Sequence, residues 1–321
     1  MAKLRCAILD DYQNVALKMA DWSKVADDLD IKVFDKHLGD TEQAARALQG
    51  FPIICAMRER TPFPAAMFDK LPDLKLLTTT GMVNRGIDLD AAKAHNVMVC
   101  GTPSFGNPTA GIAWGLILEL TRSIGRENAR LKAGETWQSV VGTDVEGLTL
   151  GIIGLGKLGT RVGEIAKAFR MKVAVWSQNI TPERASKAGF EFAGSKEELL
   201  KQSDIVSIHI PLSPKSRGLI GAKELGLMKP NALLINTSRG PIVEQEPLLD
   251  ALRNKKIAGA GFDVYDTEPL PLDHPFRKLD NVVLTPHLGY VSQQNYRAYF
   301  NGVVEDIRGF LDGKPVRVLT A

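Results

Sequence analysis

The amino-acid sequence predicts an α/β protein that contains two parallel β-sheets. Short β-branched runs alternate with helical patterns in both halves of the chain, as in crossover connections between parallel strands. In addition, a G-x-G-x-x-G turn at 154–159 lies far into the chain, although most folds that carry such a turn begin with it. The leading half is therefore expected to build a separate unit.

In the leading half, several short runs have the length and composition of buried strands. These runs are Leu4–Leu9, Ile31–Phe34, Ile53–Met57, Leu74–Thr79 and Val97–Cys100. The helical patterns between them cover Thr41–Leu48, Pro64–Asp69 and Asp88–His95. Strands separated by helices of this size predict a parallel sheet with both faces covered.

The second half repeats this alternation after a long helical pattern, Thr109–Leu131, which is expected to bridge the two units. Its expected strands are Leu148–Ile153, Val173–Trp176, Ile205–Ile208, Ala232–Asn236, Ala258–Phe262 and Val282–Leu284. Its expected helices are Ser195–Lys201, Ala222–Met228 and Glu246–Asn254. The closing pattern Ser292–Leu311 is also helical and is expected to pack against the leading unit, which makes that unit discontinuous.

Length and composition limit the class of protein. The 321 residues suffice for two domains, and shares of 44% hydrophobic and 24% charged residues are those of a globular chain. A net charge of +3 argues against a nucleic-acid-binding surface and slightly favours small anionic ligands. Neither a signal peptide nor a membrane-spanning run is expected. Cys6, Cys55 and Cys100 lie apart in apolar runs, so we expect reduced thiols, a cytoplasmic location and no metal site.

The turn at 154–159 predicts a dinucleotide site of the Rossmann type. It follows the apolar run 148–153 and opens a helical stretch. In such a turn Gly154 makes the tight bend, Gly156 lets the backbone approach a pyrophosphate, and Gly159 lets helix and strand pack closely. The phosphate then lies at the N-terminus of the helix. We therefore expect NAD or NADP as the cofactor.

Three residues near predicted strand ends suit the reduction of a ketone. A nicotinamide carries hydride but no proton, so the reaction needs a positioned acid, and His287 follows a strand in a turn bounded by proline and glycine. Glu268 precedes a proline in an irregular loop, and a carboxylate beside the histidine would favour the imidazolium. Arg239 offers a planar fork that matches a substrate carboxylate. The structural alternatives are a turn histidine, a solvated acid and a surface arginine.

Several segments together resemble the D-isomer-specific 2-hydroxyacid dehydrogenase family, of the phosphoglycerate dehydrogenase and glyoxylate/hydroxypyruvate reductase type. They are distributed over nearly the whole chain and comprise residues 154–159, 204–214, 228–240, 259–265, 268–271 and 285–287. The resemblance implies that Arg239, Glu268 and His287 are catalytic. It also implies that Asp263 engages the nicotinamide carboxamide.

The resemblance further implies which residues bind the cofactor and the substrate. The expected cofactor-binding residues are Gly154, Gly156, Lys157, Leu158, Gly159, Ser177, Gln178, His209, Ile210, Pro211, Thr237, Ser238, Asp263 and Gly289. The expected substrate-binding residues are Arg58, Gly81 and Met82, with backbone N–H groups of the loop at Gly81 on the substrate carboxylate. Arg58 and the nearby Arg60 could bind a phosphate or second carboxylate, or form a solvated rim, and the sequence leaves both open.

The implied fold is a Rossmann NAD(P)-binding domain, residues 102–290, inserted into a flavodoxin-like substrate domain formed by residues 1–101 and 291–321. The implied activity is the reversible reduction of a small 2-oxo acid, of glyoxylate or hydroxypyruvate type, to the D-2-hydroxy acid by a homodimer. D-3-phosphoglycerate dehydrogenase is one alternative. An alternative of another class is a non-catalytic NAD(H)-sensing protein similar to corepressors. No regulatory domain is expected after the closing helix.

Two departures from the family pattern concern the cofactor site. Relatives often carry an acid after the second cofactor strand, where it grips the adenosine ribose hydroxyls, whereas here the strand ends at Ser177 and Gln178. Because an acid would repel a 2′-phosphate, these neutral residues favour NADP over NAD, with Arg184 as a phosphate partner. Trp114 stands where relatives usually have a glutamate, which leaves open whether that helix contacts the cofactor.

Overall fold

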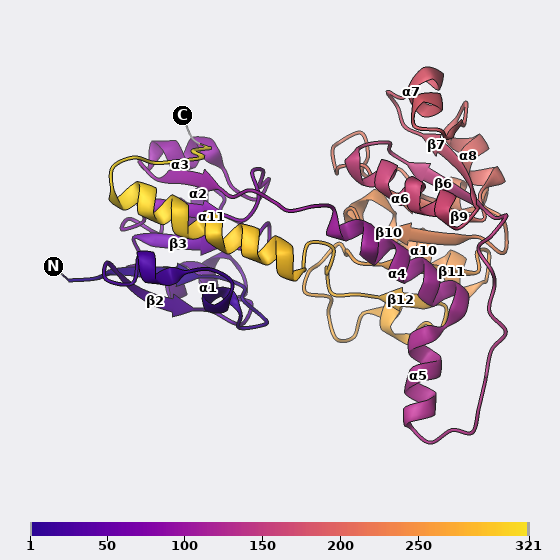
Figure 1. The fold of residues 1–321 in the computed structure, drawn as a ribbon, viewed down its shortest axis with the longest axis horizontal. Helices are drawn as coiled ribbons and strands as arrows, with labels where there is room; N and C mark the ends of the chain where they lie inside the picture. The colour runs from indigo at the N-terminus through magenta and orange to yellow at the C-terminus, as the bar shows by residue number, and fades with distance from the viewer. Residues whose placement is uncertain (1, 320–321) are drawn as a thin grey trace. The chain divides into compact units, whose positions relative to one another are not determined.

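The computed structural model describes residues 2–319, which form two compact units, each with its own parallel sheet (Figure 1). Unit 1 comprises the residues up to Gly106 together with those from Ser292 onward, and unit 2 comprises Asn107–Val291. Unit 1 is thus built from both ends of the chain. None of the helices within residues 2–319 is both long and apolar enough to cross a membrane.

The sheet of unit 1 has the strand order β2-β1-β3-β4-β5, and all of its pairs are parallel. Its strands are β1 (Leu4–Ile8), β2 (Leu29–Val33), β3 (Ile53–Ala56), β4 (Leu76–Thr79) and β5 (Met98–Gly101). Every residue of β3 and β4 is buried, as expected for a parallel sheet covered on both faces. This strand order is the flavodoxin-like one, and it reverses direction between β1 and β3.

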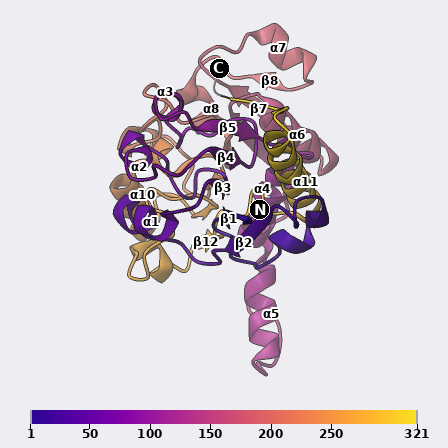
Figure 2. The same ribbon diagram turned by 90° about the vertical axis from the view of Figure 1, so that its left-hand side faces the viewer.

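Helices cover both faces of this sheet. They are α1 (Thr41–Leu48), α2 (Ala65–Phe68), α3 (Leu89–Ala94) and α11 (Gln293–Leu311), with short 3-10 turns η1 (Ala16–Lys18) and η2 (Trp22–Lys24). Helices α1, α2 and α3 share one core with the sheet, and α11 lies on the other face (Figure 2). Helix α11 contacts β4 and β5 and buries Phe300, whose ring also lies 6.5 Å from that of Trp22. The last helix of the chain therefore completes the unit that the first strand begins.

The sheet of unit 2 has the order β12-β11-β10-β9-β6-β7-β8 and is also parallel throughout. Its strands are β6 (Thr149–Ile153), β7 (Lys172–Trp176), β8 (Glu191–Phe192), β9 (Ile205–Ile208), β10 (Leu233–Asn236), β11 (Gly259–Phe262) and β12 (Val282–Leu284). Counted from β6, this is the dinucleotide-binding order 3-2-1-4-5-6 with one further strand at the edge. The order reverses between β6 and β9, where ligands bind in such sheets.

Two cores cover the faces of this second sheet. The helices are α4 (Pro108–Arg122), α5 (Ile124–Lys132), α6 (Lys157–Ala168), α7 (Pro182–Lys187), α8 (Lys196–Gln202), α9 (Ala222–Leu225) and α10 (Gln245–Arg253), with 3-10 turns η3 (Gly240–Ile242) and η4 (Pro275–Lys278). Helices α4 and α6 bury apolar side chains in one core, and α8, α9 and α10 bury theirs in the other. The predicted fold class, two doubly wound parallel-sheet units, is confirmed.

The prediction of one continuous helix over Thr109–Leu131 is wrong. Helix α4 ends at Ser123, which has a φ of +51° and donates its N–H to the carbonyl oxygen of Glu119 at 2.7 Å. Helix α5 starts in a new direction, and none of its residues is buried. In both views α5 projects from the rest of unit 2 (Figures 1 and 2). The short elements α7 and β8 were not predicted.

Candidate active site

The glycine turn joins β6 to α6 at the point where the strand order reverses. Gly154 has a φ of +102°, and a Cβ atom there would lie 2.7 Å from the carbonyl oxygen of His209 and 2.5 Å from Cγ2 of Ile210. A Cβ atom on Gly159 would overlap with the carbonyl oxygen of Gly154. By contrast, a Cβ on Gly156 would meet nothing within 4 Å. Close backbone packing thus requires the outer two glycines, while the middle one leaves the turn open to a ligand.

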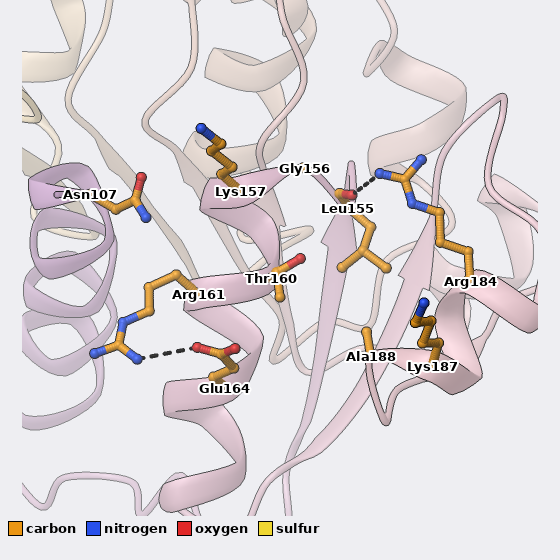
Figure 3. Close-up of a pocket in the computed structure, with 10 residues that line it drawn as sticks. All are labelled: Asn107, Leu155, Gly156, Lys157, Thr160, Arg161, Glu164, Arg184, Lys187 and Ala188. Carbon is orange, nitrogen blue, oxygen red and sulfur yellow. Dashed lines mark hydrogen bonds and ion pairs between the residues drawn. The ribbon is translucent and has the colours of Figure 1, made fainter. Parts of the chain in front are cut away.

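The start of α6 is suited to an anion. Gly156 is its N-cap (Figure 3) and provides no side-chain cap, so the first backbone N–H groups of the helix, beginning at Lys157 and Leu158, remain available. Two buried side-chain atoms at the ends of neighbouring strands also have no partner among the described residues, namely Nδ1 of His209 and Oγ1 of Thr237. Unpaired buried polar atoms call for a bound polar partner. These features fit a dinucleotide.

His287 and Glu268 form a close pair in unit 2. Nδ1 of His287 lies 2.7 Å from Oε2 of Glu268, and both side chains are about one-fifth exposed, at 18% and 20%. The backbone N–H of Tyr265 donates to the other carboxylate oxygen at 2.9 Å, which fixes the orientation of Glu268. Within residues 2–319, Nε2 of His287 has no hydrogen-bond partner. The pair therefore presents an imidazole with one anchored nitrogen and one available nitrogen.

Asp263 holds the turn that carries His287. Its Oδ1 accepts hydrogen bonds from the Thr285 hydroxyl and from the N–H of Leu288, both at 2.6 Å, and its Oδ2 accepts the N–H of Gly289 at 2.7 Å. This clamp stabilises His287 in the left-handed region, at a φ of +52°. Burial raises the pKa of Asp263, although these hydrogen bonds act in the opposite direction. A carboxylate can accept about four hydrogen bonds, so a further donor can still bind.

Arg239 follows β10 and lies in a turn closed by Asn236. The side-chain amide of Asn236 donates to the Arg239 carbonyl oxygen at 2.9 Å and accepts the N–H of Ser238 at 3.0 Å. A Cβ atom on the next residue, Gly240, would lie 2.5 Å from the backbone nitrogen of Asp266, so this turn packs directly against the loop that leads to Glu268. Unit 2 thus brings all three predicted catalytic residues to one edge of its sheet.

Sequence reasoning missed two residues that position this site. Asn236 closes the turn of Arg239, and Thr285 binds Asp263 through its hydroxyl. Both act through backbone or carboxylate groups whose positions only the folded chain defines. The available signal was a polar residue at the end of an apolar strand, because Asn236 is the last residue of β10 and Thr285 directly follows β12.

Unit 1 groups the predicted substrate residues at the carboxyl edge of its own sheet. Arg58 follows β3 with a φ of +52°, and its Nη1 donates to the Thr80 carbonyl oxygen at 3.2 Å. The guanidinium covers Gly81, because a Cβ atom there would overlap with Nη1. The N–H of Gly81 donates to Oγ1 of Thr102 at 3.0 Å and is therefore engaged within the protein. Met82, the next residue of the loop, is exposed.

Trp114 has a packing role between α4 and α6. Its indole N–H donates to the Val162 carbonyl oxygen at 3.2 Å, and its ring stacks on Phe169 with 4.8 Å between ring centroids. The side chain is buried in the core between these helices and the sheet. Other predicted cofactor residues remain at the surface: Ser177 is half-buried, and Gln178 and Pro211 are exposed.

The sheet of unit 2 has the strand order of a dinucleotide-binding fold, and its carboxyl edge carries an arginine and a histidine–carboxylate pair. These are the groups that a nicotinamide-dependent dehydrogenase needs.

The family model described as D-isomer specific 2-hydroxyacid dehydrogenase, NAD binding domain, matches residues 114–289. A glyoxylate reductase of Thermococcus litoralis is 37% identical over 257 residues, which are 77% of this chain and 77% of that protein.

Two longer matches agree with this result. A D-3-phosphoglycerate dehydrogenase of Methanocaldococcus jannaschii is 35% identical over 264 residues, 81% of this chain, which spans 50% of that relative's length. The crystal structure of a phosphoglycerate oxidoreductase from Vibrio cholerae has a TM-score of 0.91 and 33% identity, covering 97% of this chain and 99% of that one. The chain belongs to the D-isomer specific 2-hydroxyacid dehydrogenase family, a family of NAD-dependent oxidoreductases, which confirms the predicted family.

Proposed function

We propose that this chain reduces a small 2-oxo acid to the D-2-hydroxy acid in a reversible reaction, with glyoxylate or hydroxypyruvate as the substrate type. The observation that carries the proposal is the His287–Glu268 pair, 2.7 Å apart, at the carboxyl edge of a dinucleotide-binding sheet. The 37% identity to a glyoxylate reductase supports the substrate type. The 35% identity to a D-3-phosphoglycerate dehydrogenase favours that activity as the alternative.

His287 is the proposed acid. When bound, the nicotinamide supplies the hydride. Nε2 of His287 donates a proton to the carbonyl oxygen of the substrate during reduction and accepts it again during oxidation. Glu268 accepts a hydrogen bond from the N–H group at Nδ1 of His287. This bond fixes the tautomer of the imidazole and stabilises its protonated form.

Arg239 is the proposed anchor for the substrate carboxylate, because its planar guanidinium can bind both oxygens at once. In unit 1, we assign the substrate-binding role to Arg58 and to the loop of Gly81 and Met82. The strained backbone and the two hydrogen bonds of Arg58 to Thr80, at 2.9 and 3.2 Å, support a preorganised anion-binding side chain. We further assign His209 and Thr237 to the cofactor, since each has an unpaired buried atom.

The test of the proposed function follows nicotinamide absorbance in solutions of the full chain. Glyoxylate, hydroxypyruvate, pyruvate, 3-phosphohydroxypyruvate and longer 2-oxo acids are added in turn, with NADH or with NADPH. We expect turnover with the small acids and a D-configured product in chiral chromatography. Preference for 3-phosphohydroxypyruvate would support the alternative activity. Tight cofactor binding without turnover of any acid would contradict both.

For the cofactor we propose NADP(H) in preference to NAD(H), because β7 ends at Trp176 and is followed by Ser177 and Gln178 with no acid. Ser177→Asp should weaken NADPH binding at least about tenfold more than NADH binding, since like charges brought together cost several kcal/mol. Ser177→Asn changes the side chain without adding charge and is the matched control. Equal losses for the two cofactors in the aspartate variant would contradict this preference.

We propose that the protein is a cytoplasmic homodimer. Cys6, Cys55 and Cys100 are free and buried, which supports a reducing compartment. Helix α5 leaves Ile124 and Leu131 exposed, and Trp137 and Val141 in the segment after it are exposed as well. Several exposed apolar side chains in one segment support a protein–protein contact there. Sedimentation equilibrium should give twice the chain mass, and Leu131→Lys should shift the equilibrium toward the monomer. A monomeric wild-type chain would contradict the assembly.

A further inference from the structure

Residues 317–319, here called the edge segment, lie along the outer strand of the sheet in unit 1. The N–H of Gly101 donates to the Arg317 carbonyl oxygen at 3.1 Å, and the N–H of Leu319 donates to the Val99 carbonyl oxygen at 2.7 Å. Between these two bonds the edge segment and β5 form an antiparallel bridge. The edge segment thus covers part of the free edge of β5.

The side chain of Arg317 fixes the edge segment to helix α11. Its Nε and Nη2 lie 3.1 Å and 2.8 Å from Oδ1 of Asp306, and its Nη1 donates to Oε2 of Glu305 at 2.8 Å. Nη2 also donates to the Gly302 carbonyl oxygen at 2.9 Å. These contacts hold the backbone of Arg317 in the left-handed region, at a φ of +52°. One guanidinium therefore joins three residues of α11 to the edge of the sheet.

The burial of Asp306 makes this contact difficult to replace. The Asp306 side chain is fully buried, and its Oδ2 has no hydrogen-bond partner within residues 2–319. Burial raises the pKa of Asp306 to about 7, whereas Arg317 acts in the opposite direction. Without the guanidinium, the carboxylate would be a buried charge without its cation, which is strongly destabilising. Asp306 therefore holds the Arg317 side chain in one position.

One path of contacts leads from Arg317 to the predicted substrate loop at Gly81. Gly302, which accepts the bond from Arg317, packs directly against Thr102, because a Cβ atom on Gly302 would lie 2.8 Å from Cβ of Thr102. The buried hydroxyl of Thr102 in turn accepts the N–H of Gly81 at 3.0 Å. Close-packed interiors transmit displacements. A shift of α11 at Gly302 would therefore move the hydroxyl group that holds the loop.

A second path runs through the end of β5. A Cβ atom on Gly101 would lie 2.9 Å from the Gly81 carbonyl oxygen, 3.1 Å from Cα of Met82 and 3.2 Å from Cδ1 of Leu319. The Leu319 side chain and the backbone of the loop thus meet at the same point of β5. Leu319 also packs against the core of unit 1. The edge segment that Arg317 holds in place therefore adjoins the loop directly.

We propose that Arg317 is a positioning residue that holds the loop of Gly81 and Met82 in its substrate-binding arrangement, through Gly302 on one side and Leu319 on the other. The inference rests on the proposed function in that this loop binds the substrate carboxylate. Arg317 acts through other residues and does not contact the substrate. Its loss should therefore weaken the binding of the acid and leave the proton transfer intact.

Steady-state kinetics of the full chain test this role. Arg317→Gln should raise the KM for hydroxypyruvate about tenfold and change kcat less than about twofold, as when binding that is common to the ground state and the transition state is lost. Arg317→Lys keeps the charge but not the planar fork, so it should restore part of the affinity. Leu319→Ala leaves the contacts of the guanidinium intact and should raise the KM by a smaller factor.

Hydrogen–deuterium exchange provides a measurement that does not depend on turnover. The N–H of Gly81 should exchange at least about tenfold faster in Arg317→Gln than in the wild-type chain, because its acceptor hydroxyl is no longer held in place. Exchange in α1, which covers the opposite face of the same sheet, should not change. Faster exchange throughout unit 1 would indicate a general loss of stability and would overturn the positioning role.

The matched control is Arg308→Gln. Arg308 also belongs to α11 and forms ion pairs with Asp28 and Asp312, both at 2.7 Å, so this variant loses the same charge and similar contacts. It should leave the KM for hydroxypyruvate and the exchange of Gly81 unchanged. Equal effects of Arg308→Gln and Arg317→Gln would overturn the proposal.

Three further results would overturn the positioning role of Arg317. They are an unchanged KM in Arg317→Gln, a loss confined to kcat, and a raised KM without faster exchange at Gly81. The outcome is separable from that of the proposed function. Faster exchange at Gly81 in a chain that reduces no 2-oxo acid would reject the reaction and keep the role of Arg317 in holding the loop, whereas turnover with a KM and an exchange rate independent of Arg317 would do the reverse.

Discussion

The ends of β12 and β9 carry the same residue type in opposite surroundings. His287, after β12, is partly exposed and bonds to a carboxylate through Nδ1. His209, after β9, is buried, bonds through Nε2 to the Ser207 hydroxyl at 2.8 Å, and has no partner for Nδ1 within residues 2–319. Burial lowers the pKa of His209 from 6.5 to about 3.

Both histidines lie at the same edge of one sheet, so this position does not decide whether a histidine can exchange a proton. Its burial and its hydrogen-bond partner do. A buried imidazole without a carboxylate stays neutral and can only donate or accept hydrogen bonds. An imidazole beside Glu268 can hold a positive charge and exchange a proton. The two sites lie in one sheet, so variants at both can be compared in the same protein.

The largest expected effect is at His287. His287→Ala should lower kcat by roughly 10²–10⁴-fold, because one positioned general acid is lost. The matched variant His209→Asn keeps a neutral hydrogen-bonding side chain and should affect the dissociation constant of the cofactor more than kcat. Steady-state kinetics and cofactor titration separate the two. Near-normal turnover of His287→Ala, or an equal loss of kcat in both variants, would contradict the assignment of proton transfer to His287 and of cofactor binding to His209.

The next effect concerns Glu268. Glu268→Gln keeps the shape and the hydrogen-bonding capacity but removes the charge that stabilises the imidazolium. The upper pH limit for reduction should move downward, because the protonated ring loses its charged partner. The pH profile of kcat for reduction measures this shift, and cofactor affinity serves as the control. An unchanged profile would exclude Glu268 from the proton transfer.

The smallest effect is one of stability. The unfolded chain protonates His209 below pH 6.5, whereas the folded chain resists protonation down to about pH 3. The contribution of the neutral His209 to the free energy of unfolding is therefore fully present above pH 6.5. It is lost as the pH falls from 6.5 toward about 3. In His209→Asn, the slope of the unfolding free energy between pH 6 and 5 should decrease by up to about 1.4 kcal/mol per pH unit. Denaturant titrations at each pH provide the measurement, and identical slopes would contradict the burial argument.

The sequence predicts those features that depend on local pattern. The runs at Ile205–Ile208 and Val282–Leu284 are strands with the predicted bounds, and Thr41–Leu48 is a helix with the predicted bounds. The break at Ser123 was missed because the apolar pattern continues across it while the backbone turns left-handed. Helix α7 was missed because six residues carry too little periodicity to be recognised.

The site residues also fall into those that the sequence indicated and those that only the folded chain defines. Residue types at strand ends indicated His287 and Arg239, because parallel topology places those ends at one edge. The clamp of Asp263 on Leu288 and Gly289, and the hydrogen bond from Arg184 to the Leu155 carbonyl oxygen, join residues far apart in the chain. No local pattern encodes such contacts. They depend on how the loops pack once the sheet has formed.

Helix α11 has a consequence for how the protein is made. All strands of unit 2 lie between residues 149 and 284, so the ribosome translates them before α11. Unit 1, although begun first, must wait for the last helix to cover the second face of its sheet. During that interval its unfinished apolar face is open to aggregation, and chaperone dependence should concentrate in the segment that is translated earliest.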